Sequence, residues 1–393
     1  MTPSTHDIVL LSTADWDNPF WTNKQHVAKE LEKKGFRILY IESVGIRKPS
    51  VKSQDVLRII RRIIKGVRPP KKVSSNIYVW SPLSIPFRRY TLVNWLNKQL
   101  FNCLLSIYKR TVLSKKKKKV LWTYLPITKQ YIQPKKFDLS VYHCVDDISA
   151  QPRMPVDLIN VQEKLLTQEV DYVFTTAPSL QEKCSVWNDN TFFFPNVADY
   201  DHFSSALSEE CHIPDDIKAI PNPKVGFIGA ISSYKLNFEL IAYTAQELPD
   251  TSFVFIGKVG EGDPLTSIDT LQSLKNVHFV GPREYKLLPN YLKDMDAMLL
   301  PNNINQYTTS MFPMKFFEYL AAGKPIVSVD LPAIKEHSKY YYVSEDYSSF
   351  VKNVQKAIFE KRENEQNNSD YAKQFTYTNR MEKMLEVINR KTV

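Results

Sequence analysis

Residues 310–329 read SMFPMKFFEYLAAGKPIVSV and combine a helix start, a helix end and an apolar strand in one short stretch. Pro313 has the fixed φ that suits the first position of a helix. The apolar pattern that follows closes at Gly323, and the run IVSV (Ile326–Val329) is typical of a buried strand. This stretch predicts a helix leading into a strand, the unit from which α/β domains are built.

The same alternation extends outward in both directions. In the second half of the chain we expect helices near 237–248, 285–293 and 313–322, and strands at Val225–Ile231, Phe253–Ile256, Val277–Val280, Ala297–Leu300, Ile326–Val329 and Tyr341–Val343. In the first half we expect a helix at Lys24–Lys34 and strands at His6–Ser12, Arg37–Glu42, Ile77–Trp80, Val120–Tyr124, Leu139–Cys144 and Tyr172–Thr175. Such alternation predicts parallel sheets covered on both faces, with ligands bound beyond the carboxyl ends of the strands.

The length of 393 residues favours two domains. The stretch Tyr200–Lys224 is polar, contains prolines and has little periodicity, so we interpret it as the interdomain linker. The expected domains are 1–200 and 201–368. Residues 369–393 are expected to form a last helix that packs back on the first domain.

Composition describes a soluble globular chain, with 43% hydrophobic and 24% charged residues. The four cysteines have no CxxC spacing, which fits neither a zinc site nor a disulfide framework and favours a reducing cytoplasm. The first residues lack the basic and apolar regions of a secretory signal, and no run of eighteen apolar residues occurs. Any membrane contact is therefore expected to be peripheral.

The positive charge is concentrated in the first half. Residues 1–200 hold 31 lysines and arginines against 17 acidic residues, a net charge of +14, whereas the remainder has a net charge of −4. The segment Val56–Arg68, VLRIIRRIIKGVR, has the pattern of a basic amphipathic helix. It predicts contact with an anionic membrane surface, and the alternative is a helix packed on its own domain with a basic outer face. Lys115–Lys119 is expected to be a solvated loop, and neither basic segment has a nucleic-acid recognition motif.

The helix that starts at Pro313 has the chemistry of a phosphate site. Its free amides attract anions, and Lys315 adds a full positive charge in the first turn. Glu318 lies three residues further on, near Lys315, and can accept hydrogen bonds from ribose hydroxyls. The alternative is an ordinary amphipathic helix with one surface ion pair.

The pattern P-M-K-x-x-E-Y-L-A-A-G-K-P-I-V resembles the donor-binding signature of GT-B glycosyltransferases that build bacterial surface polysaccharides. These include xanthan-type glucuronosyltransferases and teichuronic acid enzymes. The segments 225–235, 253–258, 277–292 and 296–303 agree with the family in order. The resemblance implies two Rossmann-like domains with parallel sheets facing across a cleft. It also implies metal-independent hexosyl transfer from a nucleotide-sugar, with uridine as the expected nucleoside, to a lipid-linked or glycan acceptor of the cell envelope or capsule. No cofactor is implied, and the expected location is the inner face of the cell membrane.

The resemblance also assigns roles in the donor site. Lys315 would hold the diphosphate, Glu318 the ribose and the loop Gly281–Arg283 the edge of the base, while Lys235 would be a second phosphate cation. The full donor set adds Gly229, Ser310, Pro313 and Met314. Many retaining members have a glutamate where this chain has Ser310, and a glycine pair where it has Ser12, Thr13 and Ala14. Both differences leave the stereochemical outcome open.

Acceptor residues are expected after the first strand, in Ala14–Trp21 (ADWDNPFW). Asp15, Trp16 and Trp21 are the candidates, because tryptophan can stack on a sugar ring; the alternative is that the tryptophans are core anchors beside a helix cap. Asp15 and Asp17 match the Asp-x-Asp pattern of metal-dependent transferases, but they come too early for that fold, so no metal site is expected.

The candidate general base is Asp146 or Asp147, at the end of the expected strand Leu139–Cys144. Repulsion between adjacent carboxylates raises one pKa toward that of a useful base. Caps or salt-bridge partners are the alternative for both aspartates, and His26 and His143 are further candidates for the base. Two other functions remain open: a nucleotide-sugar epimerase of the same architecture, and a peripheral membrane scaffold with a vestigial donor site.

Overall fold

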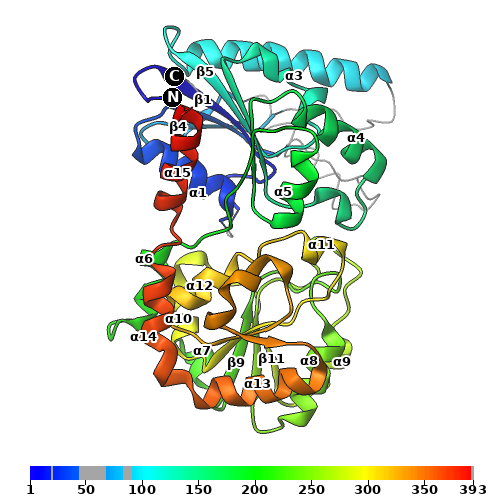
Figure 1. The fold of residues 1–393 in the computed structure, drawn as a ribbon, viewed down its shortest axis with the longest axis vertical. Coiled ribbons are helices and arrows are strands. Elements are labelled where there is room, and N and C mark those ends of the chain that lie inside the picture. The colour runs from blue at the N-terminus through cyan, green and yellow to red at the C-terminus, as the bar shows by residue number, and fades with distance from the viewer. Residues whose placement is uncertain (19–20, 44–67, 83–90, 391–393) are drawn as a thin grey trace. The chain divides into compact units, whose positions relative to one another are not determined.

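The computed structural model describes residues 1–18, 21–43, 68–82 and 91–390, which divide into two units (Figure 1). Unit 1 comprises Met1–Phe194 together with Met381–Val393, and unit 2 is Pro195–Arg380. Residues 56–67 of the basic segment Val56–Arg68 lie outside the described part of the chain.

Unit 1 is built on an eight-stranded sheet in the part of the chain that the structure describes. The strands run in the order β3-β4-β2-β1-β5-β6-β7-β8, and all neighbours are parallel except β3 and β4. The strands are β1 (His6–Leu11), β2 (Ile38–Ile41), β3 (Lys71–Lys72), β4 (Ile77–Trp80), β5 (Lys118–Thr123), β6 (Leu139–Cys144), β7 (Tyr172–Thr175) and β8 (Thr191–Phe193). The helices are α1 (Asn23–Lys33), α3 (Thr91–Thr111), α4 (Val156–Thr167), α5 (Pro178–Ser185) and the C-terminal α15 (Tyr377–Arg390).

Side chains alternate between the two faces of this sheet, and each face has its own core. One face buries Ile8 and Leu10 of β1 together with Val27 of α1 and Met384 of α15. The opposite face buries the neighbouring β1 residue Val9 and residues of α3 and α4. Strands covered on both faces are apolar throughout, which explains why their runs are continuous rather than alternating in the sequence.

Unit 2 contains a six-stranded parallel sheet in the order β11-β10-β9-β12-β13-β14 among its described residues. The strands are β9 (Lys224–Ile228), β10 (Ser252–Ile256), β11 (Val277–Phe279), β12 (Ala297–Leu300), β13 (Ile326–Val329) and β14 (Tyr342–Ser344). The helices are α6 (Tyr200–Ser204), α7 (Asp215–Lys218), α8 (Phe238–Glu247), α9 (Asp269–Gln272), α10 (Leu288–Lys293), α11 (Gln306–Thr309), α12 (Lys315–Ala321), α13 (Tyr347–Phe359) and α14 (Lys361–Ala372). The strand order reverses between β9 and β12, so the carboxyl ends of these two strands mark the place where open α/β sheets bind ligands. The predicted fold class of two α/β domains with parallel sheets is confirmed.

The predicted linker Tyr200–Lys224 was wrong. This stretch contains α6, a 3₁₀ turn at Ser205–Leu207 and α7, and it ends with the first residue of β9. Phe203, Ala206 and Ile217 are buried in the core of unit 2. Each element is one turn or slightly longer, which is too short for a helical period to stand out in the sequence.

Two further boundaries differ from the sequence prediction. β9 ends at Ile228 rather than Ile231, because Gly229 takes a φ of +156° and leaves the strand conformation. The expected single helix near the C-terminus is two helices, α14 and α15. The segment between them still belongs to unit 2, where the N–H of Ala198 donates to the carbonyl of Phe375 at 3.0 Å. The division between the units therefore falls at Phe194 and Arg380 instead of at 200 and 368.

Helix α8 offers a test of local stability in unit 2. Asn237 is its N-cap, and its side-chain oxygen accepts from the N–H of Leu240 at 2.9 Å. Asn237→Ala is expected to lower the free energy of unfolding of unit 2 by about 1 kcal/mol. Urea denaturation followed by far-UV circular dichroism measures this change, and Asn237→Asp, which keeps the capping oxygen, is expected to recover most of it.

Candidate functional site

Three glycines follow the three adjacent strands β9, β10 and β11. The N–H of Gly229 donates to Ile256 at 2.9 Å, and the N–H of Gly257 donates to Gly281 at 3.1 Å. All three have positive φ, and a Cβ placed on Gly257 would lie 1.8 Å from the carbonyl oxygen of Gly229. Backbone therefore lies directly against backbone at the carboxyl edge of this sheet, where side chains would otherwise cover the strand ends.

The loops after β9 and β12 are joined to each other at the reversal of strand order. The N–H of Asn303 donates to the carbonyl of Lys235 at 2.9 Å, and the Asn305 side chain donates to the carbonyl of Tyr234 at 2.8 Å. The Lys235 ammonium lies 5.3 Å and 5.6 Å from the ring centroids of Tyr234 and Tyr307. Lys235 is thus placed by two aromatic rings on loops that meet at the switch point.

Helix α12 packs against the end of β9. The N–H of Ile228 donates to the hydroxyl of Tyr319 at 2.9 Å, and that hydroxyl lies 3.3 Å from the carbonyl of Ile228. Because a helix between parallel strands runs opposite to them, the residues before Tyr319 lie beyond the strand ends. These residues are Ser310, which ends α11, followed by Pro313, Met314, Lys315 and Glu318.

Lys315 and Glu318 form an ion pair at this end of α12. The Lys315 Nζ lies 2.5 Å from a Glu318 oxygen, and the Glu318 side chain is only 4% exposed. Burial raises the pKa of the Glu318 carboxyl, and the neighbouring Lys315 charge opposes that rise. The alternative of an ordinary surface ion pair does not fit, because the Glu318 carboxylate is buried and a buried carboxylate is costly unless it is paired or bound.

Three residues near this pair were missed in the sequence. His202 of α6 stacks on Tyr285 with ring centroids 4.5 Å apart, and its Nε2 lies 2.9 Å from the Tyr285 carbonyl oxygen. Phe203 places its ring centroid 5.8 Å from the Lys315 Nζ. The spacing of Phe203 and Ala206 by three positions was the available signal, and the linker interpretation concealed it.

The Arg283 side chain is held by other residues of unit 2 and is not positioned to bind a base. Its guanidinium pairs with Asp216 at 2.7 Å, and its Nε donates to the Tyr291 hydroxyl at 2.6 Å. The side chain thereby connects the loop after β11 to α7 and α10. Any contact of Gly281–Arg283 with a base would come from the backbone of that loop.

The segment after β1 in unit 1 is held by polar and aromatic contacts. The N–H of Trp16 donates to the Glu42 carboxylate at 2.8 Å, and the Gln25 side chain donates to the carbonyl of Asp15 at 3.1 Å. The Trp16 ring lies 5.1 Å from Tyr40 and 5.7 Å from Trp21, centroid to centroid. Trp16 and Trp21 are partly buried, and Asp15 is exposed.

The two candidate bases differ in their surroundings. Asp147 is the N-cap of the 3₁₀ turn Ile148–Ala150, and its Oδ1 accepts from the Ser149 hydroxyl at 2.6 Å. Lys183 lies 3.8 Å from the same oxygen, so the cap and the salt bridge expected as alternatives are both present. Asp146, the preceding residue, is half-buried.

The two candidate histidines lie in aromatic surroundings. His143 is fully buried and stacks on Tyr124 at 4.8 Å, in contact with the rings of Trp122 and Phe174. His26 packs edge-on against Trp21 at 5.5 Å. The burial of His143 prevents it from touching a substrate.

Within the described ranges, no group of three or more histidine, cysteine or acidic side chains is arranged to hold a metal ion. None of the described helices combines the length and apolar character needed to cross a membrane. Cys103, Cys144, Cys184 and Cys211 are free thiols.

Comparison with known proteins links unit 2 to one family. Residues 222–359 match the family "Glycosyl transferases group 1". TuaH of Bacillus subtilis, named for a role as a teichuronic acid biosynthesis glycosyltransferase, is 38% identical over 127 residues. That alignment spans 31% of this chain and 31% of TuaH.

Solved structures resemble the chain over almost its whole length. Anabaena HepE in complex with UDP and glucose has a TM-score of 0.64 at 15% identity, with 98% of this chain and 99% of HepE covered. The trehalose-6-phosphate synthase of E. coli with UDP-2-fluoro glucose has a TM-score of 0.63 at 11% identity, with 97% and 98% covered. These likenesses establish the fold. The segment 222–359 therefore matches the glycosyl transferases group 1 family, within a chain that has the two-domain α/β fold of these solved structures.

Proposed function

We propose that the protein transfers a hexose from a UDP-sugar to a lipid-linked or glycan acceptor in cell-surface polysaccharide synthesis. The observation that carries the proposal is the Lys315–Glu318 pair with its buried carboxylate at the start of α12, inside the segment that matches the group 1 family and beside the reversal of strand order. The alignment with TuaH supports a polysaccharide acceptor. The complexes of HepE with UDP support uridine as the nucleoside.

The donor would be held by charge and hydrogen bonds. When the diphosphate enters, the Lys315 ammonium exchanges its contact with Glu318 for a phosphate oxygen, and Glu318 accepts hydrogen bonds from the ribose hydroxyls. Lys235 is the second cation of the proposed site, with Gly229 and Gly281 allowing close approach of the backbone. The buried Glu318 carboxylate has already lost its contact with bulk water, so ligand binding adds little further desolvation cost.

In the proposed reaction, an acceptor hydroxyl oxygen attacks the anomeric carbon while the bond from that carbon to the β-phosphate oxygen breaks. Negative charge develops on the departing UDP, and fixed cations stabilise it. Lys315 and Lys235 supply that charge, so we propose that transfer proceeds without a metal. The hydroxyl proton passes to a general base of unit 1.

Asp146 is the stronger candidate for that base, because it is half-buried and more accessible than Asp147, which is buried. For an inverting transfer, Asp146→Asn is expected to lower kcat by about 100-fold or more with little change in UDP affinity. Asp147→Asn is expected to lower the melting temperature through its weakened cap. Steady-state kinetics and calorimetry with UDP separate the two effects, and full turnover in both variants would remove the assignment.

A thermal-shift screen against nucleotide-sugars tests the proposed function, since a ligand that binds only the folded state raises the melting temperature. UDP-sugars are expected to raise the melting temperature most. In a second assay, the protein is expected to transfer the sugar to an added acceptor. Conversion of the sugar without any acceptor would show an epimerase instead. A protein that binds no nucleotide would be a scaffold, and the proposal would fail.

The location we propose is the inner face of the cell membrane, with Val56–Arg68 on an anionic lipid surface. The proposal rests on the sequence pattern of that segment. Liposome flotation tests it, and equal recovery with neutral and anionic vesicles would contradict it.

A further inference from the structure

A long part of unit 1 contains no acidic residue. Residues 56–137 include 20 lysines and arginines and no aspartate or glutamate. Helix α3 lies within this segment, and its own sequence has no acidic side chain. The net positive charge of this segment attracts anions.

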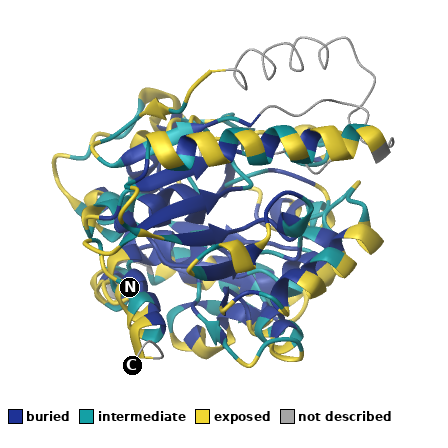
Figure 2. Ribbon diagram, turned by 90° about the horizontal axis from the view of Figure 1, so that it is seen from above, coloured by how far each residue is buried: buried dark blue, intermediate teal, exposed yellow. Residues whose placement is uncertain are grey.

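Helix α3 carries exposed and buried residues in alternation along its length (Figure 2). Phe101, Leu105 and Tyr108 pack into the core of unit 1. On the opposite side, Leu92, Trp95, Leu96 and Ile107 are 67%, 55%, 40% and 47% exposed. At about 100° per residue these four side chains fall within an arc of about 120°. Gln99, Cys103, Ser106 and Arg110 are exposed in the same arc, so the outer face is mixed, and its large apolar side chains gather at Leu92, Trp95 and Leu96. Large apolar side chains gathered in one place, unlike single ones, indicate an interaction surface.

Cations occur on this helix and directly after it. Arg110 is exposed in the last turn, and Lys98 is half-buried on the flank. After the helix, Lys115, Lys116 and Lys118 are exposed.

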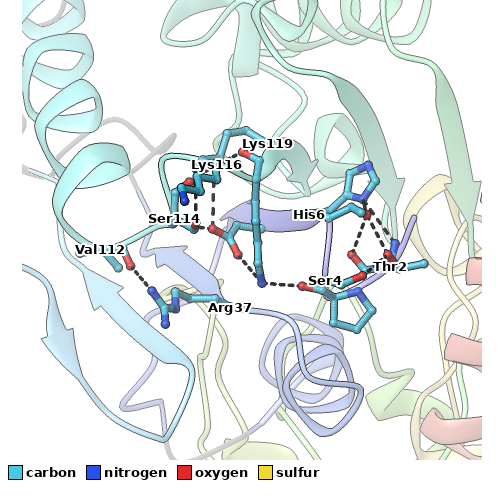
Figure 3. Close-up of polar contacts among 12 residues, drawn as sticks. Thr2, Ser4, His6, Arg37, Val112, Ser114, Lys116 and Lys119 are labelled. Carbon is cyan, nitrogen blue, oxygen red and sulfur yellow. Dashed lines mark hydrogen bonds and ion pairs between the residues drawn. The ribbon is translucent and has the colours of Figure 1, made fainter.

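The lysine run is only in part the solvated loop expected from its sequence, because β5 begins at Lys118 and two lysines of the run are directed inward. Lys117 and Lys119 approach the buried Asp7 at 3.7 Å and 3.8 Å, and the Lys117 Nζ donates to the carbonyl of Pro3 at 2.5 Å. Figure 3 shows Ser114, Lys116 and Lys119 close together, and there the N–H of Ser114 donates to the Asp7 carboxylate at 2.6 Å. The other three lysines of the run remain available at the end of α3.

We propose that the outer face of α3 lies on an anionic lipid surface, with Leu92, Trp95, Leu96 and Ile107 in the interface between headgroups and acyl chains. Apolar and aromatic side chains on one face of a helix, flanked by cations, are typical of helices that lie in the plane of a bilayer. Tryptophan in particular favours this interface. The inference extends the membrane contact proposed for Val56–Arg68 to a helix that the structure describes, and it does not depend on the transferase activity.

Other occupants fit this surface less well. A second copy of the chain would bring the same positive charge against itself, and like charges placed together disfavour association. A nucleic acid would find Trp95 as the one aromatic ring among the four exposed apolar residues named above, whereas single-strand binding uses several stacked aromatics.

Flotation of the full chain with phosphatidylcholine vesicles, with and without phosphatidylglycerol, tests the proposal. The wild type is expected to float with the anionic vesicles, and the double variant Leu92→Ser/Trp95→Ser is expected to bind them at least about tenfold more weakly. The matched control is Leu265→Ser/Phe359→Ser, which removes two side chains that are 88% and 90% exposed in unit 2. The control is expected to float like the wild type.

Trp95 also gives a direct reading of insertion. Its fluorescence is expected to shift to the blue on anionic vesicles, and Trp95→Phe is expected to keep flotation but lose that shift. A double variant that floats as well as the wild type would overturn the proposal. So would a double variant that changes self-association in sedimentation equilibrium while vesicle binding stays the same. UDP binding measured on each variant keeps this result separate from the donor site, which the substitutions do not touch.

Discussion

Lys315→Ala is expected to lower kcat/KM for sugar transfer by about 100- to 1000-fold, the effect of losing one preorganised charge from a transition state. The Lys315 Nζ is the cation that pairs with Glu318 at the start of α12, and it would be lost just where charge develops on the departing UDP. Steady-state kinetics measure the change, with calorimetry giving the affinity for UDP.

A second effect of this substitution must be separated from the first. Without Lys315 the buried Glu318 carboxylate loses an ion-pair partner, which costs stability and favours its neutral form. Lys315→Arg keeps the charge and is expected to retain UDP affinity. Lys335→Ala removes an exposed lysine from the same unit and serves as the control for net charge. Unchanged kcat/KM in folded Lys315→Ala would refute the proposed donor site.

Gly257→Ala is expected to destabilise unit 2 by about 3 to 5 kcal/mol, combining overpacking with backbone strain. The new methyl group would lie 1.8 Å from the Gly229 carbonyl oxygen, and an adjacent backbone cannot move aside as a flexible side chain can. Gly257 also has a φ of +155°, which an L side chain rarely adopts. Because the two strand ends would have to separate, UDP binding is expected to fall together with stability.

Gly281→Ala is the control for Gly257→Ala. It has a similarly unfavourable φ of +81°, but its nearest neighbour would be the Arg283 side chain at 3.8 Å, so only the strain contributes.

The six tryptophans of the chain all lie in unit 1, at positions 16, 21, 80, 95, 122 and 187. Tryptophan fluorescence therefore follows the unfolding of unit 1, and hydrogen exchange of β9 and β10 peptides follows that of unit 2. A Gly257→Ala protein as stable as Gly281→Ala would contradict the close approach.

The sequence predicted the secondary structure of the central strands closely. The expected bounds Leu139–Cys144, Tyr172–Thr175, Ala297–Leu300 and Ile326–Val329 agree with β6, β7, β12 and β13. These strands are covered on both faces, so burial appears in the sequence as an uninterrupted apolar run. The chain order of strands and helices then predicted the parallel sheets and the fold class.

The surroundings of the candidate site could not be obtained in this way. Lys315 and Glu318 are three residues apart, so one helical turn alone brings them together. His202 and Tyr285 meet across a sequence separation of 83 residues, and Arg283 meets Asp216 across 67. The roles of Asp147 as a cap and of Lys117 and Lys119 beside Asp7 were equally invisible in the sequence.

The sequence by itself determined which segments become strands and helices, and that Lys315 and Glu318 share the first turns of one helix. Only the tertiary structure decided that Glu318 is buried, that Arg283 is occupied by Asp216 and that α6 lies beside α12. The physical reason is that local periodicity records which side of a segment is buried. It does not record which distant segment covers that side, because that choice depends on packing and pairing across the whole unit.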